Sequence, residues 1–378
     1  MTRRVAVVGG GALGVTAAHD LASRDDDVTL YERDEVASGA SGRAAGIAYD
    51  ALAEDVDAAV AERALERFRT LDANRAIDFT AHPYVWFARA GDDRRAHAVR
   101  ESVQRMRTNG GDVQRLDGEA LADRFPTLGP VDVAVGAVAR DAGYLDPATY
   151  VRAMAERAEF AGATVEAGTS VSLAHDGTTV ETHTGRESYD AVLVAAGAHT
   201  TQLLAGVGVA VPMKPYRVQA LVTESVDGVD AVPTFYDATT SRYARPRDGG
   251  LLVGDGTQER EFDPDDYDTD ADPAFERASL DWLDGTLDDE ATESGFEVRR
   301  SWAGLCTATP DRDPLLGRVQ SGLYIATGWH GHGFMRAPAL GERIADQILG
   351  GSAIDPFDPN RFAGDESFDV AEGMTVEE

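Results

Sequence analysis

Two apolar runs near the start of the chain flank a segment of small residues. Residues 5–8 (Val-Ala-Val-Val) and 28–31 (Val-Thr-Leu-Tyr) are rich in β-forming side chains, and residues 12–22 have a helical composition. A short apolar run bounded by glycine is typical of a buried strand. The order strand, helix, strand predicts a βαβ unit with two parallel strands and a crossover helix.

The rest of the chain predicts further helices and strands. Apolar residues at helical spacing predict helices over 51–79, 94–109, 120–125, 148–161 and 337–349. Antiparallel strands are predicted over 218–224, 234–236, 241–245 and 250–253. Two further buried strands, within 189–198 and 323–328, each lead into a glycine turn. This mixture predicts an α/β protein.

Glycines at fixed spacing follow the first strand. Gly9 permits a tight turn, Gly11 lets a phosphate approach the backbone, and Gly14 lets helix and strand pack closely. Glu32 follows the second strand, 18 residues after Gly14, where an acid accepts hydrogen bonds from ribose hydroxyls and would repel a 2′-phosphate. These features in order predict a dinucleotide-binding site; the alternative is a glycine-rich turn in an ordinary α/β domain.

The segment after Glu32 also consists of small residues. Residues 38–47 are mostly Ser, Gly and Ala, a composition that does not predict a helix of its own. Small residues let the backbone approach a ligand closely, and Arg43 would add a fixed positive charge. We therefore expect this segment to contact the cofactor, with a surface linker as the alternative.

Length and cysteine content limit the class of protein. The 378 residues suffice for two domains, and no apolar run is long enough to predict a membrane span. The chain enters its first strand at once, so we expect no signal peptide and a cytoplasmic location. Cys306 is the single cysteine, which excludes an intrachain disulfide and argues against a cysteine metal cluster. We expect no metal site.

The formal net charge of −31 is unusual for a folded enzyme of this size. Only one lysine, Lys214, is present, and acidic runs such as 25–27 and 263–266 are typical of solvated loops. We interpret the charge as adaptation to a salt-rich cytoplasm, where screening removes self-repulsion, rather than as an acidic partner surface. The charge also argues against nucleic acid and anionic membranes as partners.

Motifs spread over nearly the whole chain carry a family resemblance. They are the glycine motif with Glu32, 40–46 (Ala-Ser-Gly-Arg-Ala-Ala-Gly), 192–198, 245–254, 302–305, 309–311 (Thr-Pro-Asp), and Gly328 with 331–334 (Gly-His-Gly-Phe). In this order they resemble the D-amino acid oxidase-like (DAO) family of FAD-dependent amine oxidoreductases. The resemblance is strongest to the branch of glycine oxidase, sarcosine oxidase and dimethylglycine dehydrogenase.

The resemblance implies a discontinuous Rossmann-like FAD-binding domain with an inserted α+β substrate domain on a mixed or antiparallel sheet. The FAD-binding domain would comprise 1–80, 141–215 and 300–362, and the substrate domain 81–140 and 216–299. We expect the acidic residues 363–378 to form a disordered tail, because they lack a core pattern. The family passes a hydride from the substrate α-carbon to flavin N5, and the resulting imine hydrolyses.

The resemblance also implies which residues bind FAD. The ADP half would lie on the opening motif, and the isoalloxazine would reach the C-terminal glycines. The implied residues are Gly9, Gly11, Ala12, Leu13, Gly14, Glu32, Arg33, Ser41, Gly42, Arg43, Ala44, Ala45, Gly46, Val171, Ala196, Gly197, Trp302, Gly304, Gly331, His332, Gly333, Phe334 and Met335.

The chain departs from the family pattern at three positions. Gly304 stands where covalent members such as the monomeric sarcosine oxidases carry a cysteine, so we expect non-covalent FAD. Cys306 replaces the arginine with which glycine oxidase-like proteins bind the substrate carboxylate. Leu252 replaces a lysine that helps dioxygen react in sarcosine oxidases, which makes a dehydrogenase with another electron acceptor an alternative to an oxidase.

Candidate catalytic residues follow from these departures. His330 and His332 could carry protons or donate hydrogen bonds beside the flavin, and Tyr243, like Tyr236, could line the substrate pocket. A carboxylate favours a bidentate arginine. The candidates for that role are Arg43, Arg242, Arg300 and Arg336.

Three functions remain open at this point. The first is an FAD-dependent oxidoreductase that oxidises the C–N bond of a small amino acid or N-methylated amine and passes electrons to dioxygen or a redox partner. The second is a 2-hydroxy-acid dehydrogenase of the same fold, which needs a base such as His330 or His332. The third is a non-catalytic flavin-binding or electron-transfer subunit.

Overall fold

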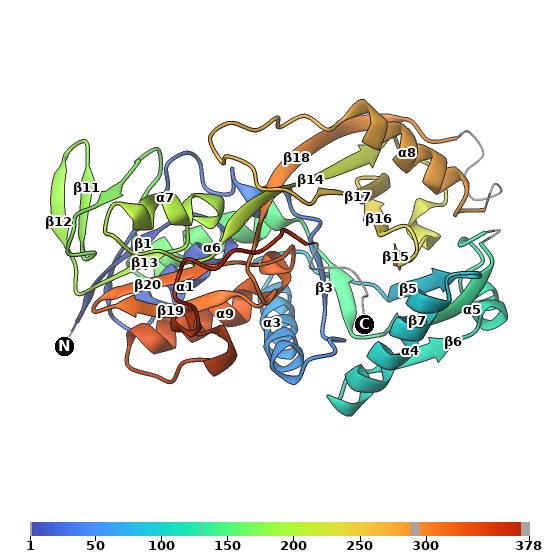
Figure 1. The fold of residues 1–378 in the computed structure, drawn as a ribbon, viewed down its shortest axis with the longest axis horizontal. Coiled ribbons are helices and arrows are strands. Elements are labelled where there is room, and N and C mark those ends of the chain that lie inside the picture. Colours follow the sequence, from blue (N-terminus) through green and yellow to red (C-terminus); the bar gives the residue numbers. More distant parts are fainter. Residues whose placement is uncertain (1, 130, 289–294, 372–378) are drawn as a thin grey trace.

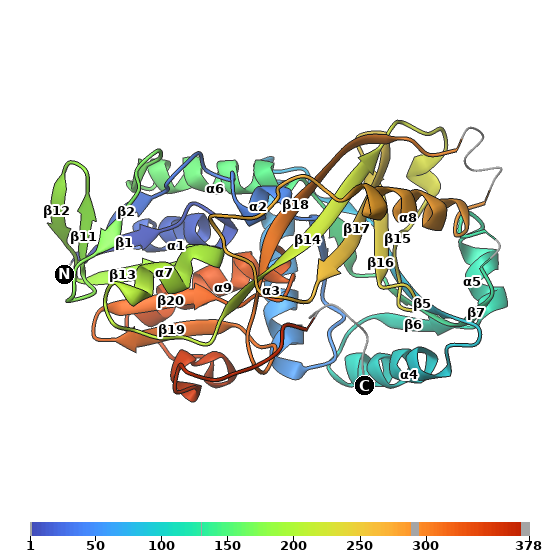
Figure 2. The same ribbon diagram turned by 45° about the horizontal axis from the view of Figure 1, so that its top comes forward.

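Two large sheets lie towards opposite ends of the molecule in the computed structural model (Figures 1 and 2). The structure describes residues 2–129, 131–288 and 295–371. Strands β14 (Lys214–Thr223) and β18 (Val298–Ala308) run from the centre of the molecule into the second sheet. No helix in the described ranges has the length and apolar character needed to cross a bilayer.

The first sheet is mainly parallel and contains the predicted βαβ unit. Its strand order is β19-β20-β13-β1-β2-β9, and only the pairing of β19 with β20 is antiparallel. The central strands are largely apolar because both faces of the sheet are covered. The strands are β1 (Arg4–Val8), β2 (Asp27–Tyr31), β9 (Thr164–Glu166), β13 (Ala191–Val194), β19 (Leu315–Gln320) and β20 (Leu323–Thr327).

Alternate residues of β1 enter two different cores. Val5 and Val7 pack with four helices, whereas Ala6 and Val8 face a second cluster that contains Leu204 of α7. This alternation explains why residues 5–8 of the first strand include no polar position. The helices of the first core are α1 (Ala12–Ala22), α3 (Asp55–Ala73), α6 (Pro147–Phe160) and α9 (Gly333–Ile348). The other face of the sheet is covered by α7 (Thr200–Ala205) and the strands β10 (Ser172–Leu173), β11 (Thr179–Thr182) and β12 (Gly185–Ser188).

The second sheet is antiparallel except where β15 pairs with β5, so the predicted mixed or antiparallel sheet is confirmed. Its strand order is β18-β14-β17-β16-β15-β5-β7-β6. One face packs on α8, through Trp282, and the other on α4, through Val99. The remaining elements are β5 (Tyr84–Arg89), β6 (Val113–Leu116), β7 (Val133–Ala139), β15 (Thr234–Asp237), β16 (Arg242–Arg247), β17 (Gly250–Gln258), α4 (Asp93–Thr108), α5 (Gly118–Arg124) and α8 (Pro273–Asp284).

The chain passes between the two sheets several times. A small sheet of β3 (Ile47–Tyr49), β8 (Ala142–Tyr144) and β4 (Thr80–Ala81) lies where the chain crosses. The predicted boundary at residue 300 falls inside β18, which pairs along its length with β14 of the second sheet. The first residues of the predicted 300–362 segment therefore belong to that sheet.

Three segments differ from the sequence expectation. Segment 38–47 contains a short helix, α2 (Ala40–Arg43), although its composition did not predict one. Helix α9 begins at Gly333 rather than at 337 and accommodates Pro338 near its start. Residues 363–371 pack against the protein instead of forming a free tail, since Val370 is buried against Tyr216; residues 372–378 lie outside the described residues.

Candidate functional site

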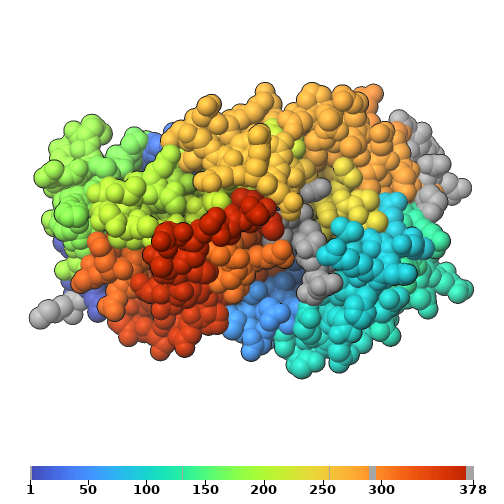
Figure 3. Space-filling view, viewed as in Figure 1, coloured from blue at the N-terminus to red at the C-terminus, as the bar shows by residue number. Residues whose placement is uncertain are grey.

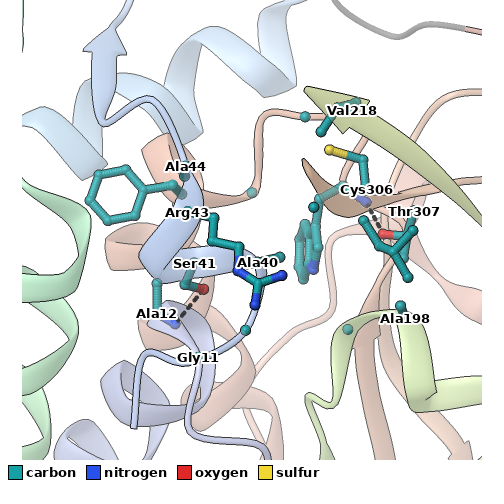
Figure 4. A pocket seen from close by; sticks show the side chains of 18 of the residues that line it. Gly11, Ala12, Ala40, Ser41, Arg43, Ala44, Ala198, Val218, Cys306 and Thr307 are labelled. Carbon is teal, nitrogen blue, oxygen red and sulfur yellow. Dashed lines mark hydrogen bonds between the residues drawn. The ribbon is translucent and has the colours of Figure 1, made fainter. Parts of the chain in front are cut away.

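A cavity of about 480 Å³ joins the carboxyl end of the parallel sheet to the second sheet. The turn after β1, the start of α2, β18 and the start of α9 all contribute to its wall. Figure 4 shows Ser41 and Arg43 on one side of it and Cys306 and Val218 on the other. Ligands of open α/β sheets bind in this place, beyond the carboxyl ends of the strands.

The glycine turn has the conformation that the sequence predicts. Gly9 has φ +116°, in the region that favours glycine, and a Cβ there would collide with the backbone of Ala195. A Cβ on Gly14 would collide with the carbonyl of Gly9, so Gly14 serves helix–strand packing and does not itself line the cavity. A Cβ on Gly11 would lie 3.0 Å from Ser41 Oγ. Because Gly11 has no side chain, its backbone is open to the cavity.

Glu32 lies at one end of the cavity, at the end of β2. Its Oε2 accepts a hydrogen bond from the Gly10 N–H (2.7 Å), and its Oε1 accepts one from the Asp34 N–H (3.0 Å). A carboxylate has further lone pairs on both oxygens, so these bonds leave acceptor capacity for ribose hydroxyls. The two backbone bonds fix the carboxylate in place before any ligand binds.

The N-terminus of α1 opens on the cavity beside α2. Ser41 Oγ accepts a hydrogen bond from the Ala12 N–H at 3.0 Å (Figure 4). A helix N-terminus with free N–H groups favours anions such as phosphate. Ser41 therefore links α2 to the helix end that the sequence predicts as a pyrophosphate site.

Arg43 extends from α2 to β18. Its Nη1 donates to Tyr267 Oη (2.8 Å) and to the Ala303 carbonyl (3.4 Å), while Trp302 Nε1 donates to the Arg43 carbonyl (3.2 Å). A Cβ on Gly304 would lie 3.7 Å from Arg43 Cδ, an ordinary contact. Arg43 is thus held next to Gly304, the position at which covalent relatives carry their cysteine.

The four candidate arginines have different positions. Arg43 lines the cavity, and the other three do not. Arg336 is buried and pairs with Asp57 (2.9 Å), Arg300 lies over the Trp302 ring at 5.0 Å, and Arg242 is half-buried in β16. Of these four candidates, Arg43 is therefore the one placed to meet a ligand in this cavity.

Cys306 and Leu252, the two other positions at which the chain departs from the family pattern, lie in different places. Cys306 is half-buried and lines the cavity, where the glycine oxidase-like pattern places its carboxylate-binding arginine. Leu252 is fully buried in β17 and does not line the cavity. Leu252 therefore contributes no side chain to the cavity wall.

Four tyrosines line the end of the cavity that lies against the second sheet. Tyr49 and Tyr84 stack with ring centroids 4.6 Å apart, and Tyr243 lies over Gly254, where a Cβ would collide with its ring. Burial raises the pKa of Tyr49 to about 12 and the pKa of Tyr84 well above its ordinary value. These phenols therefore stay neutral and protonated near pH 7. Tyr236 completes the group.

The two candidate histidines have different surroundings. His330 is 2 % exposed, has φ +46°, and does not line the cavity; its Nε2 accepts from the Thr309 N–H (2.7 Å). Burial lowers its pKa to about 4. His332 does line the cavity, and burial together with Arg336 lowers its pKa to about 3. The placement supports a ligand contact for His332 and a structural role for His330.

Most of the predicted FAD-binding residues line this cavity. Gly14 and Gly42 lie behind it, and a Cβ on Gly42 would collide with the Ala37 carbonyl. Val171 packs in the core beside β10 instead. The residues that line it are Gly9, Gly11, Ala12, Leu13, Glu32, Arg33, Ser41, Arg43, Ala44, Ala45, Gly46, Ala196, Gly197, Trp302, Gly304, Gly331, His332, Gly333, Phe334 and Met335.

Sequence reasoning missed a second set of lining residues. Tyr49 and Tyr84 lie outside every motif that the sequence analysis singled out, and Gln219 lies in the predicted strand 218–224, which carries no motif. Pro264 lies in the acidic run 263–266, which the sequence predicted to be a solvated loop, and Tyr267 directly follows that run. Among the described residues, no group of three His, Cys, Asp or Glu side chains could hold a metal ion.

Segment 259–272 crosses from the second sheet to the first. Asp265 accepts hydrogen bonds from Gln202 Nε2 (2.9 Å) and Arg33 Nη1 (3.4 Å) and lies 3.1 Å from His199 Nε2. Figure 3 shows this segment, in gold, on the surface next to the yellow-green region that contains α7. Together with Tyr267, Asp265 holds the segment over the cavity.

The residues present fit an extended dinucleotide. Gly11 lines the cavity without a side chain, and Glu32 has free acceptor capacity. An added Cβ on Gly39 or Gly197 would meet no atom within 4 Å. A long ligand can therefore pass from Glu32, over the start of α1, to β18 and α9.

Comparisons with known proteins identify the family. Residues 4–347 match the DAO family, described as FAD dependent oxidoreductase. Glycine oxidase of Pseudomonas aeruginosa is 29% identical over 386 residues, covering 96% of this chain and 99% of that protein. The 4-methylaminobutanoate oxidase (formaldehyde-forming) of Paenarthrobacter nicotinovorans is 27% identical over 393 residues, and the chain spans 46% of its length.

A solved structure supports the same assignment. The L-proline dehydrogenase from P. horikoshii superposes with a TM-score of 0.85 at 26% identity, covering 96% of this chain and 98% of that one. Both the sequence match and this superposition extend over nearly the whole chain. The chain belongs to the DAO family of FAD-dependent oxidoreductases.

Proposed function

We propose that the protein oxidises the C–N bond of a small amino acid or N-methylated amine by hydride transfer to flavin N5, giving an imine that hydrolyses. One observation carries the proposal: a continuous cavity connects a dinucleotide cradle with a wall of neutral tyrosines. FAD would supply the hydride acceptor. The side chains would bind and orient the amine and exclude water.

The cofactor would be held by the residues of the cradle. Glu32 would accept from the ribose, and the N-terminus of α1 with segment 40–46 would bind the pyrophosphate. Gly304 and the start of α9 would lie beside the flavin ring. Since the described lining places glycine where covalent relatives have cysteine, we propose that FAD is bound non-covalently.

The tyrosine end would favour the neutral form of an amine. An ammonium group has no lone pair to drive loss of a hydride from its α-carbon, so the amine must first lose a proton. A partly desolvated pocket disfavours the charged form and lowers the amine pKa. Tyr243 and His332 are proposed to orient the substrate, and Arg43 to contact a substrate carboxylate or the cofactor.

The 2-hydroxy-acid alternative needs a base that takes a hydroxyl proton. Of the two candidate histidines, His332 is the one that lines the cavity, and its pKa, lowered to about 3, makes it a weak base. Amine oxidation needs no such group. This difference favours the amine function.

Anaerobic flavin reduction tests the proposal. The purified protein at high salt is mixed with amino acids, N-methyl amines and hydroxy acids, and the flavin absorbance is followed. Bleaching by an amine is expected. Bleaching only by hydroxy acids would favour the second function, and no bleaching across the panel would favour an electron-transfer subunit.

The same sample settles the electron acceptor and the attachment of FAD. Return of the flavin colour in air identifies an oxidase, whereas persistent bleaching identifies a dehydrogenase with another acceptor. After acid precipitation we expect a colourless pellet; a yellow pellet would contradict non-covalent binding.

The acidic composition and the single cysteine further support a proposed salt-rich cytoplasmic location.

A further inference from the structure

The turn that leads into α9 contains two histidines, His330 and His332, whose ring nitrogens have different partners. His330 Nε2 accepts from the Thr309 N–H at 2.7 Å, so its hydrogen must lie on Nδ1. His332 Nδ1 lies 3.4 Å from Nη2 of Arg336, one turn further along α9. A guanidinium can only donate, so Nδ1 of His332 must be the acceptor. The two rings are therefore set in opposite tautomers.

Arg336 is fixed by a buried ion pair. Its Nη1 lies 2.9 Å from Asp57 Oδ1, and the two side chains are 7% and 13% exposed. Asp57 belongs to α3, which packs along α9 in the core of the first sheet. Separating such a pair would leave a buried charge without compensation, so the guanidinium keeps its position. Arginine also keeps its proton at any physiological pH.

This arrangement decides the state of His332. A protonated imidazole has no lone pair for Arg336 and would be repelled by its charge. The ring must therefore be neutral with its hydrogen on Nε2, the nitrogen that Arg336 does not engage. His332 also lines the cavity. We propose that Arg336, held by Asp57, is a positioning residue that fixes His332 as a neutral Nε2–H donor to a ligand in the cavity.

The role as a donor to FAD or substrate rests on the proposed function, whereas the tautomer depends only on contacts within the chain. A donor of this kind gives the cavity an N–H group that does not change its charge with pH. It would remain a donor before and after negative charge accumulates on an acceptor atom, and its hydrogen bond would strengthen as that charge develops.

The surrounding charges support a His332 ring that stays neutral as the pH changes around neutrality. Its ring faces Arg336 and His330, and Arg336 in turn faces Asp57, Tyr49 and Asp313. Burial and Arg336 lower the pKa of His332 to about 3. Burial and the charge of Asp57 raise the pKa of Asp313 to about 6, so Asp313 is the group of this set that titrates near neutral pH.

Histidine nitrogen shifts test the proposal directly. The full-length protein with its bound cofactor is labelled with ¹⁵N-histidine, and the two rings are assigned by loss of signal in His330→Asn and His332→Asn. We expect the hydrogen on Nδ1 for His330 and on Nε2 for His332, without titration of His332 between about pH 5 and about pH 9. A hydrogen on Nδ1 of His332, or titration near the ordinary pKa of about 6.5, would overturn the proposal.

Variants of Arg336 test the cause. In Arg336→Met, His332 should become a mixture of tautomers and its pKa should rise, although burial still holds it below the ordinary value. Arg336→Lys, which keeps a cationic donor, should preserve the Nε2–H form. An unchanged His332 in Arg336→Met would contradict the assigned role of Arg336. If that variant does not fold, the wild-type tautomer and the lysine variant still decide the question.

The pH profile of flavin reduction provides a second measurement. With any amine that bleaches the flavin, His332 should add no inflection in the wild type, and Asp313→Asn removes the contribution of Asp313. Arg336→Met should gain an inflection that the wild type lacks, at a pH below the ordinary histidine pKa of about 6.5, because the ring stays buried. If no amine bleaches the flavin, the proposed function fails, and the nitrogen shifts still report on the tautomer.

Discussion

At the scale of single residues, the cavity combines positions fixed by backbone geometry with positions fixed by side-chain contacts. Gly9 and Gly14 have close backbone neighbours, and the sequence motif predicted both roles. His330 has a left-handed backbone and an engaged Nε2, which no pattern of residue types could reveal. Neighbouring histidines in one motif can thus have unrelated roles.

Loss of the Glu32 carboxylate should weaken FAD binding. Glu32→Ala removes two backbone hydrogen bonds and the proposed ribose acceptor, so we expect FAD affinity to fall by about 10- to 100-fold. Fluorescence titration of the apoprotein measures the change. Glu35→Ala, which removes a nearby exposed acid that does not line the cavity, is the matched control and should bind normally. Equal affinity in both variants would place the ribose elsewhere.

Burial of neutral His330 should make the protein sensitive to acid. Its pKa is lowered to about 4 in the fold, so the unfolded chain binds the proton first, and stability falls as the pH drops from about 6.5 towards 4. In His330→Asn, a residue that tolerates left-handed backbone, this loss should be smaller by up to about 1.4 kcal/mol per pH unit.

Urea unfolding at several pH values measures that slope. The exposed His175 offers a matched control, since His175→Asn should leave the slope near that of the wild type. If His330→Asn keeps the full wild-type slope, other groups cause the acid sensitivity.

At the scale of elements, local pattern predicted the βαβ unit and most helices, because their apolar spacing matches the faces that they bury. The pattern failed where packing partners are distant in sequence. Segment 40–43 is helical although its composition disfavours a helix, and Ser41 in it accepts from the Ala12 N–H across the cavity. Tyr49 and Tyr84 meet only because β3 and β5 approach each other in the fold.

The acidic segment 259–272 should slow release of the cofactor, since Asp265 holds it to Arg33, His199 and Gln202. Asp265→Asn should raise the FAD dissociation rate by about 2- to 5-fold, a modest effect because these side chains are partly exposed. Asp266→Asn is the control, because it removes the same charge as Asp265→Asn from an exposed neighbouring residue whose side chain takes no part in these hydrogen bonds. Stopped-flow FAD release compares the two, and equal rates would show that the segment does not retain the cofactor.

At the scale of the whole molecule, charge and fold are separate properties. The net charge of −31 lies largely on loops and helix surfaces, while the two sheets have ordinary apolar cores. Pairs such as Arg63–Glu342 and Arg67–Asp20 stabilise α3 against neighbouring helices but leave most acids uncompensated. We therefore propose that the acidic composition reflects the solvent of the protein, whereas its chemistry depends on the residues of the cavity.

Salt should stabilise the folded chain through screening. Raising ionic strength from about 0.1 M to about 1 M shortens the Debye length from about 10 Å to about 3 Å, which reduces repulsion among surface carboxylates. The unfolding temperature should rise by several degrees in potassium chloride, and as much in sodium chloride, because screening depends on ionic strength rather than on the cation. Sucrose at equal osmolality is the uncharged control and should raise it less. A salt effect no larger than that of sucrose would mean that self-repulsion does not limit stability, and that the acidic surface has another role.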